Sequence, residues 1–266
     1  MSEPVSATRW IDGEGVALRA RVDGAGLPLL MIHEMGGCLE SWDRLAPILV
    51  SGHMVVRYDQ RGHGVSEKVR AMTLDQLVAD ALAVAGAFGL RRFVPVGCAV
   101  GGAVALAVAS RHAESCPAVV ALAPSTSIPE ARRLAAFARA DALIATGLRP
   151  NVDDALASSH PDRLREDKAL FAHMRGMRLG ADPDGQAAML RMLAQLDMSM
   201  DLAGIRHPTL ILAGRHDGDR PPEHLAEIAA GIRGATFRII ESGHFMALHA
   251  PDAVAIEMHR FLTELR

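Results

Sequence analysis

Short apolar runs without internal alternation are the feature that most limits what this chain can fold into. Each run is bounded by turn residues, and the runs are Leu27–His33, His53–Tyr58, Phe93–Gly97, Ala118–Leu122, Pro208–Ala213 and Thr236–Ile240. Strands that are buried on both faces have continuous apolar sequences, and such strands occur mainly in parallel sheets. The runs therefore predict a parallel sheet that is covered on both sides.

Helical patterns separate the apolar runs. Thr73 and Gln76 form a capping-box pattern that predicts a helix to about Phe88, where Gly89 ends it. Further helices are expected over Gly101–Ala113, from Pro221-Pro222 onward and over Pro251–Leu265, with a hairpin over Thr8–Ile11 and Val16–Val22. Because strands that alternate with helices form βαβ units, the sequence predicts an α/β fold with a doubly wound, mostly parallel sheet.

The stretch from residue 125 to residue 206, called here the inserted segment, has no strand-like run. Its helical patterns lie around Pro129–Thr146, Val152–Ser159, Arg163–Arg178 and Gly185–Leu196. A helical insertion between two strands is suited to cover the carboxyl edge of the sheet, where open α/β sheets bind ligands. We therefore expect a core of residues 1–124 and 207–266, and a helical cap, or lid, of residues 125–206.

Composition excludes several classes of function. The chain has 28 Lys and Arg and 31 Asp and Glu, a net charge of −3, which gives no electrostatic basis for binding nucleic acid or an anionic membrane. Cys38, Cys98 and Cys116 form no C-x-x-C pair, and the histidines lack metal-ligand spacing, so neither a disulfide framework nor a metal site is expected. The first residues lack a secretory signal pattern. We expect a cytoplasmic monomer or homodimer that needs no cofactor and acts on a small molecule.

The segment Gly97-Cys98-Ala99-Val100-Gly101 joins a predicted strand to a predicted helix. It resembles the nucleophile elbow of the α/β-hydrolase family, whose pattern is G-x-S-x-G. In such a turn the central residue has a strained backbone, and the residues two positions away on either side must be small. The resemblance implies an α/β-hydrolase fold with the nucleophile at the position of Ala99.

Alanine at position 99 has a methyl group, which cannot attack a carbonyl carbon. Two interpretations follow. Either the chain is a Ser→Ala variant of an active enzyme, inactivated at Ala99, or it is a homologue that lacks the nucleophile and only binds a ligand. Cys98 lies one residue earlier, on the strand side, and is expected to be an inert core residue. We favour the inactivated enzyme because the other motifs of the family are present.

Two later segments resemble the acid and histidine motifs of the same family. Asp217 follows the apolar run Pro208–Ala213, and His244 follows the run Thr236–Ile240 in a Gly-His pair. The resemblance implies that Asp217 orients the imidazole of His244, which takes the proton of the nucleophile and returns it to the leaving group. Asp217 and His244 are therefore candidate catalytic residues, together with position 99.

The sequence His33-Glu34-Met35-Gly36-Gly37 resembles the oxyanion turn of the family, H-G-x-x-G. The resemblance implies that the backbone N–H groups of Met35 and Val100 form the oxyanion hole. Glu34 departs from the usual glycine. We expect its carboxylate to pair with an arginine such as Arg61, and the alternative is a contact with the substrate.

Side chains of the inserted segment are candidates for substrate binding. The residues expected to contact the substrate are Phe137, Phe171 and Met174, together with Glu34 and Phe245. Basic residues of the segment could bind a substrate carboxylate, although each is expected to be solvated, and they are Arg139, His173, Arg175 and Arg178.

The style of the motifs is similar to that of 3-oxoadipate enol-lactonase-like proteins, C–C bond hydrolases of the meta-cleavage type and small carboxylesterases. The resemblance implies cleavage of an ester or lactone through an acyl-enzyme, in the degradation of an aromatic or alicyclic compound. A C–C bond hydrolase that uses the same residues stays open, as does a binding protein without catalysis.

Overall fold

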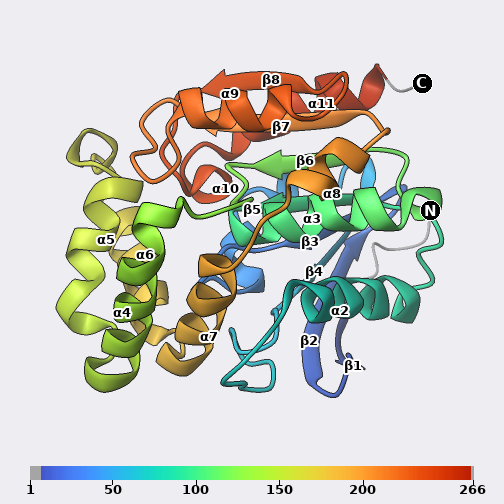
Figure 1. Cartoon of the computed structure of the whole chain (residues 1–266). Coiled ribbons are helices and arrows are strands. Elements are labelled where there is room, and N and C mark those ends of the chain that lie inside the picture. Colours follow the sequence, from blue (N-terminus) through green and yellow to red (C-terminus); the bar gives the residue numbers. More distant parts are fainter. Residues whose placement is uncertain (1–6, 265–266) are drawn as a thin grey trace.

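The computed structural model describes residues 7–264 of the chain. They contain one eight-stranded sheet with the order β1-β2-β4-β3-β5-β6-β7-β8 (Figure 1). The strands are β1 (Ala7–Asp12), β2 (Ala17–Gly24), β3 (Leu27–Ile32), β4 (His53–Tyr58), β5 (Val94–Cys98), β6 (Val119–Leu122), β7 (Thr209–Gly214) and β8 (Thr236–Ile240). All neighbours from β4 to β8 are parallel, and β1 and β2 add an antiparallel hairpin at one edge. The predicted α/β fold with a mostly parallel sheet is confirmed.

Burial along the strands follows the apolar runs, with one exception. Every residue of β5, β6 and β7 is buried, as expected for strands covered on both faces. β8 forms the edge of the sheet, and its Arg238 and Ile239 are exposed. The apolar run of β8 therefore does not reflect burial on both faces.

Helices flank the sheet. The core helices are α1 (Ala46–Leu49), α2 (Leu74–Ala87), α3 (Val100–Arg111), α9 (Pro222–Ala230), α10 (Met246–His249) and α11 (Pro251–Thr263). Of these, α2, α3, α9 and α11 lie where the sequence patterns put them, and the short helices α1 and α10 were not predicted. The capping box that starts α2 is present, since Thr73 Oγ1 accepts from Gln76 N at 3.2 Å and Gln76 Oε1 accepts from Thr73 N at 3.1 Å. α3 is rich in alanine and valine, and it is buried from Val100 to Ala109.

Some expected features lie outside the described residues. The first residues, for which the sequence predicts no secretory signal, include residues 1–6, which are not described. The expected end of the last helix at Leu265 is not described either. None of the described helices has the length and hydropathy that a membrane span requires.

The inserted segment is helical and lies at one end of the sheet. Its helices are α4 (Glu130–Thr146), α5 (Val152–Ser159), α6 (Lys168–Gly180), α7 (Pro183–Ala194) and α8 (Ser199–Gly204). In Figure 1, α4 to α7 lie together on the side toward which the arrowheads of β6 and β8 point. The expected helix from Arg163 begins later than predicted, because Arg163 belongs to a short 3-10 turn and the Asp167 side chain caps α6 through Leu170 N. The short helix α8 was not predicted.

The order of the strands brings the ends of β3 and β5 together. The chain crosses from β3 to β4 on one side and continues with β5 on the other, so β3 and β5 are neighbours, with Ile32 opposite Gly97. This is the point at which the strand order reverses, where open α/β sheets bind ligands. The loops that follow β3, β5, β6, β7 and β8 all meet at this edge.

Candidate active site

The turn between β5 and α3 places residue 99 at the apex of a sharp bend. Ala99 has φ 52° and ψ −114°, a conformation that side chains rarely adopt. A Cβ on Gly97 would lie 2.0 Å from the carbonyl oxygen of Gly101, and a Cβ on Gly101 would lie 2.0 Å from the carbonyl oxygen of Ile32. The bend therefore requires glycine at both positions, and it puts the methyl group of Ala99 at a cavity.

Asp217 and His244 form a buried hydrogen-bonded pair. His244 Nδ1 lies 2.7 Å from Asp217 Oδ2. The other oxygen, Asp217 Oδ1, accepts from the backbone N–H groups of Asp219 and Arg220, each at 2.9 Å. These bonds fix the carboxylate, which in turn orients the imidazole, and His244 lines the same cavity as Ala99. The hydrogen bond to Asp217 uses Nδ1, so the other ring nitrogen of His244, Nε2, takes no part in this pair.

The inserted segment holds the two loops that carry this pair. The carbonyl oxygen of Ser158 accepts from Gly218 N at 3.0 Å, and that of Ser159 accepts from His244 N at 2.8 Å. Both serines lie in the last turn of α5, whose terminal carbonyls lack partners within the helix. The end of α5 therefore ties the acid loop and the histidine loop together.

The turn after β3 is fixed by a buried histidine. His33 Nδ1 donates to the carbonyl oxygen of Glu34 at 2.7 Å, and His33 Nε2 accepts from Gln60 N at 3.0 Å. Burial lowers the pKa of His33, which suits this neutral tautomer. Met35 and Val100 both line the cavity. Because Val100 is the first residue of α3, its N–H has no partner within the helix.

Glu34 pairs with an arginine as expected, but the partner is Arg178 and not Arg61. Its Oε1 accepts from Ser41 Oγ at 3.1 Å and lies 3.4 Å from Arg178 Nη2, which comes from α6. Arg61 instead makes a double hydrogen bond with Asp80 of α2, at 2.7 and 2.8 Å. The helix packing that buries Asp80 against Arg61 is a tertiary contact, which spacing along the chain does not reveal.

Arg178 connects the inserted segment to both sides of the site. Besides Glu34, its Nη1 donates to the carbonyl oxygen of Met35, and its guanidinium lies 4.4 Å from the ring centroid of Phe245. Phe245 follows His244, and the two rings meet edge to face at 5.5 Å. Burial lowers the pKa of Arg178 from its ordinary value. The sequence analysis treated this residue as mainly solvated, and that expectation is wrong.

Cys98 has the surroundings of an unreactive thiol. Its side chain is buried, and its Sγ lies 3.8 Å from the carbonyl oxygen of His244. Burial raises the pKa of the thiol well above its ordinary value, which keeps it protonated.

A cavity of about 1000 Å³ opens above Ala99. Glu34 and Phe245, two of the expected substrate contacts, line it, and so do apolar residues of the inserted segment such as Leu143, Leu190 and Leu193. The other expected contacts do not line the cavity. Phe137 packs in one apolar cluster, and Phe171 and Met174 pack in another that also contains Phe245 and Leu248 of the core. The sequence could not fix how each helix is rotated about its axis, and this rotation decides which side chains reach the cavity.

Two polar residues of the cavity were missed by the sequence analysis. Arg220 lies three positions after Asp217, and its Nε donates to Ser125 Oγ at 3.0 Å. Ser125, in the loop after β6, is buried and lines the cavity with Arg220. Burial lowers the pKa of Arg220. Its closeness to the acid motif in the chain was the signal that could have identified it.

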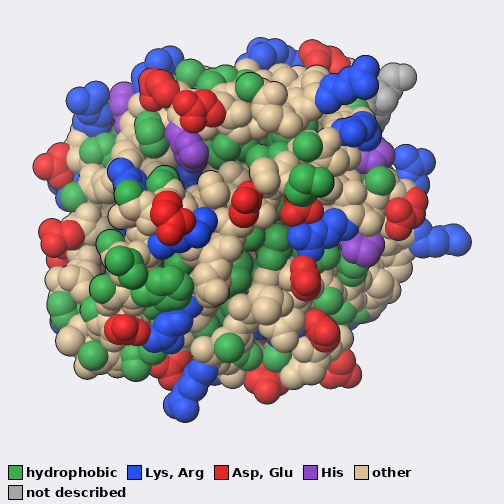
Figure 2. Space-filling view, in the orientation of Figure 1, with side chains coloured by type: hydrophobic (Ala, Val, Ile, Leu, Met, Phe, Trp, Pro, Cys, Tyr) green, Lys and Arg blue, Asp and Glu red, His purple; other side chains and the backbone are tan. Residues whose placement is uncertain are grey.

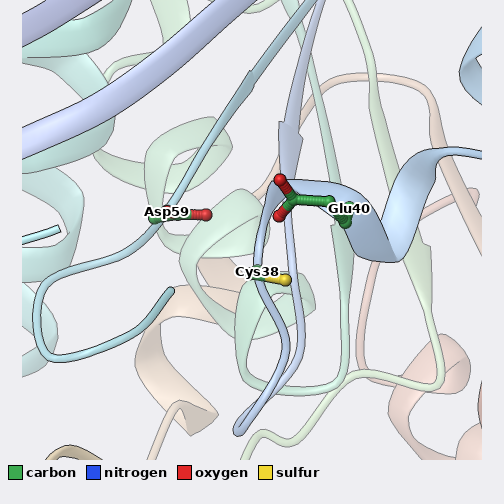
Figure 3. A group of neighbouring side chains, drawn as sticks. All are labelled: Cys38, Glu40 and Asp59. Atoms are coloured by element: carbon green, nitrogen blue, oxygen red, sulfur yellow. The ribbon is translucent and has the colours of Figure 1, made fainter. Parts of the chain in front are cut away.

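A separate group of possible metal ligands lies behind the turn after β3 (Figure 3). It consists of Cys38, Glu40 and Asp59. Arg19 donates to both carboxylates, to Glu40 Oε2 at 2.7 Å and to Asp59 Oδ2 at 2.7 Å, and Asp59 also accepts from Leu39 N at 2.7 Å. A guanidinium already supplies the positive charge here, so we interpret the group as a structural ion-pair network.

The chain belongs to the alpha/beta hydrolase family, whose profile matches residues 29–257. It is 28% identical over 253 residues to 3-oxoadipate enol-lactonase 1 of Acinetobacter baylyi, covering 90% of each chain. It is 24% identical over 255 residues to pyrrolizixenacetamide deacetylase of Xenorhabdus hominickii, covering 91% of this chain and 92% of the relative. Its relatives thus include a lactonase and a deacetylase.

Solved structures agree with this assignment. The enol-lactonase of Burkholderia xenovorans is similar with a TM-score of 0.89 at 25% identity, covering 96% of this chain and 100% of the other. A thermophilic esterase of Thermogutta terrifontis, with malate bound, is similar in fold with a TM-score of 0.90 at 22% identity, covering 97% and 99%. At these identities the likenesses establish the fold, and the family rests on the profile match.

Proposed function

We propose that the cavity above residue 99 is the site of a small-molecule hydrolase that cleaves a carboxylic ester or lactone. In this proposal residue 99 is the nucleophile position and the chain with Ala99 is the inactivated form. Met35 and Val100 supply the oxyanion hole, and the inserted segment is the cap that closes the cavity. Degradation of an aromatic or alicyclic compound, expected from the sequence, is part of the same proposal.

The observation that carries the proposal is the conformation of Ala99 at the cavity that His244 also lines. The strained φ of 52° lifts the side chain of residue 99 above the edge of the sheet. The hydrogen bond of 2.7 Å to Asp217 leaves Nε2 of His244 as the basic atom. A protein that only needed a scaffold here would gain nothing from a strained residue at this position.

The chemistry follows from these positions when residue 99 is serine. Its hydroxyl attacks the substrate carbonyl while His244 Nε2 takes the proton, and the oxyanion accepts hydrogen bonds from the N–H groups of Met35 and Val100. His244 then protonates the leaving alkoxide, which leaves an acyl-enzyme. Water attacks the acyl group with His244 as the base, and this step restores the hydroxyl and releases the acid.

The lack of a nucleophile favours a second candidate function, that of a ligand-binding homologue. The methyl group of Ala99 leaves the cavity, the base and the backbone donors in place, which suffices to hold a carbonyl compound without cleaving it. A C–C bond hydrolase is the other alternative, and it would release a carboxylic acid and a ketone or enol in place of an alcohol.

Ala99→Ser tests the proposal. We expect this variant to hydrolyse activated esters or lactones with a rate constant higher by a factor on the order of 10⁴ or more than the chain with Ala99, because it restores the nucleophile to an otherwise complete site. Mass spectrometry after a short reaction should find the acyl group on residue 99. Product analysis separates ester cleavage from C–C cleavage.

A matched control is Ala99→Ser combined with His244→Gln, which keeps the hydroxyl and removes the base. It should return the rate to that of the original chain. If Ala99→Ser gives no hydrolysis of esters, lactones or vinylogous diketones while the original chain binds such compounds, the ligand-binding function replaces our proposal.

A further inference from the structure

The cavity carries the opposite charge balance to the rest of the chain. Its charged residues are four arginines, Arg132, Arg139, Arg178 and Arg220, against two carboxylates, Glu34 and Asp219. The chain as a whole has a net charge of −3, and on the face shown in Figure 2 basic and acidic side chains are interspersed. An excess of positive charge confined to a cavity attracts an anionic ligand.

Of these four arginines, Arg220 is the one that comes from a loop of the core, and in the described part of the chain it has no carboxylate partner within ion-pair distance. Its Nε and Nη2 both donate to Ser125 Oγ, and its Nη1 donates to its neighbour's carbonyl oxygen, that of Asp219, at 3.3 Å. Arg178, by comparison, already has Glu34 at 3.4 Å. Among the described residues, no carboxylate lies within ion-pair distance of the Arg220 guanidinium.

The donors that remain on Arg220 suit a planar anion. An arginine has five N–H groups, and the bonds to Ser125 and Asp219 use three of them. One N–H on each terminal nitrogen is left, and this pair can bind both oxygens of a carboxylate in fork geometry. The half-buried guanidinium of Arg220 therefore has two free N–H donors at the cavity wall that can bind an anionic ligand.

Ser125 connects this group to the reacting centre. Its oxygen accepts from Arg220, so its own O–H proton is available to a ligand in the cavity, and its side chain is 3% exposed. Its backbone N–H donates to the carbonyl oxygen of Ala99 at 2.9 Å. A single residue thus separates the guanidinium from position 99, which limits the ligand to a short one.

We propose that Arg220 and the Ser125 hydroxyl form a carboxylate-binding subsite, with Arg132 and Arg139 adding positive charge at the exposed rim. The ligand is a small acid that carries a free carboxylate a few bonds from its ester or lactone carbonyl. The carboxylate sits on the Arg220 fork while the carbonyl lies over Ala99. The subsite stands on the geometry alone, and its assignment to the substrate rests on the proposed function.

Binding to the chain as it exists tests the subsite, since Ala99 leaves a bound ester intact. The probes are monomethyl succinate and its neutral counterpart, methyl 4-amino-4-oxobutanoate, which differ only in carboxylate against amide. We expect NMR titration at neutral pH to give a dissociation constant at least about tenfold lower for monomethyl succinate. Arg220→Gln should remove this difference without weakening the neutral probe, and Arg220→Lys should keep part of it.

Arg215→Gln is the matched control, because Arg215 belongs to the same loop and loses the same charge. Its exposed side chain pairs with Glu241, away from the cavity. It should leave both dissociation constants within twofold of the original. Equal binding of the two probes by the original chain would overturn the proposal, and so would an unchanged preference in Arg220→Gln.

The outcome for the subsite is distinct from the outcome for hydrolysis. If Ala99→Ser cleaves neutral esters while the original chain does not distinguish the probes, the proposed function stands and the subsite fails. If the carboxylate preference depends on Arg220 while Ala99→Ser is inactive, the subsite stands as the anchor of a ligand-binding protein and the hydrolase fails.

Discussion

A methyl group added to the glycines of the elbow meets a very different environment from one added to the glycines of helix α6 in the inserted segment. At Gly97 or Gly101 the added Cβ would lie 2.0 Å from a backbone oxygen, whereas at Gly176 or Gly180 of α6 it would meet nothing within 4 Å. The core loops are shaped by close contact between backbones. Helix α6 of the inserted segment has an open outer face, whereas Gly185 of α7 packs against the core, where an added Cβ would lie 2.0 Å from the carbonyl oxygen of Gly62. The same substitution should therefore have opposite effects at the elbow and in α6.

The core and the inserted segment are joined by a few hydrogen bonds to the loops that carry the candidate site. The carbonyl oxygens of Ser158 and Ser159 hold the loops of Asp217 and His244, and Arg178 reaches the turn after β3. The core thus supplies the candidate catalytic residues, while the inserted segment contributes hydrogen bonds that hold their loops. A comparison of substitutions across the two regions can separate these contributions.

Gly97→Ala should have the largest effect. Its methyl group would overlap the carbonyl oxygen of Gly101, and neither backbone can move without distorting β5 or α3. We expect a loss of about 3 kcal/mol or more in the free energy of unfolding, or failure to fold. Gly176→Ala, in the exposed interior of α6, should raise that free energy by about 0.5–1 kcal/mol.

Urea unfolding followed by circular dichroism measures both variants. If Gly97→Ala were as stable as the original chain, the close packing at the elbow would be wrong. If Gly176→Ala were strongly destabilising, α6 would be as tightly constrained as the elbow, and the contrast between them would disappear.

The fold could be predicted because its signals are local. Continuous apolar runs such as Val119–Leu122 reflect burial, and the capping box at Thr73 reflects a helix start within a few residues. α6 was placed too early because its true N-cap, Asp167, competes with an earlier 3-10 turn. β8 was grouped with the buried strands because most of its run is apolar, although Arg238 interrupts the run and the sheet ends there.

Residues of the site could be predicted only where a short motif at the end of a strand fixes their position. Position 99, Asp217 and His244 each follow a strand end, and parallel strands bring their ends to one edge. The partner of Glu34 and the position of Arg220 depend on which loops face each other across the cavity. Phe137 was misplaced because helical spacing leaves the rotation of α4 open. The catalytic roles themselves stay predictions until they are tested.

The next largest effect should be a loss of stability at low pH that depends on His160, where the inserted segment meets the core. His160 is buried at the end of α5, where its ring stacks on Phe171, with centroids 6.1 Å apart, and meets His249 edge to face at 5.2 Å. Burial, with the nearby His249 and Arg165, lowers the pKa of His160 to about 4. The unfolded imidazole, with an ordinary pKa of about 6.5, takes up its proton first as the pH falls.

The unfolded state therefore binds more protons between pH 6.5 and 4, and the protein should lose stability across that window. His160→Phe keeps the stacking and removes the titration, so at pH 5 it should retain about 2 kcal/mol more of its neutral-pH stability than the original chain. Denaturant unfolding at pH 7.5 and pH 5 measures this. Parallel losses in the two proteins would mean that His160 titrates normally, and the remaining losses would come from buried core histidines such as His63, whose pKa burial lowers to about 3.

The smallest effect should follow from loosening the contact of Arg178 with the turn after β3. Arg178→Gln removes the charge beside Glu34 and shortens the side chain, while its amide can still reach part of the network, so we expect a loss of about 1 kcal/mol in unfolding free energy. Arg175→Gln lies on the same helix but pairs with the exposed Asp153, and it should cause no measurable change. Equal effects of the two substitutions in urea unfolding would mean that the bridge from α6 to the core contributes nothing beyond an ordinary surface ion pair. A loss confined to Arg178→Gln would instead identify this arginine as one contact, beside the carbonyls of Ser158 and Ser159, through which the inserted segment stabilises the loops of the core.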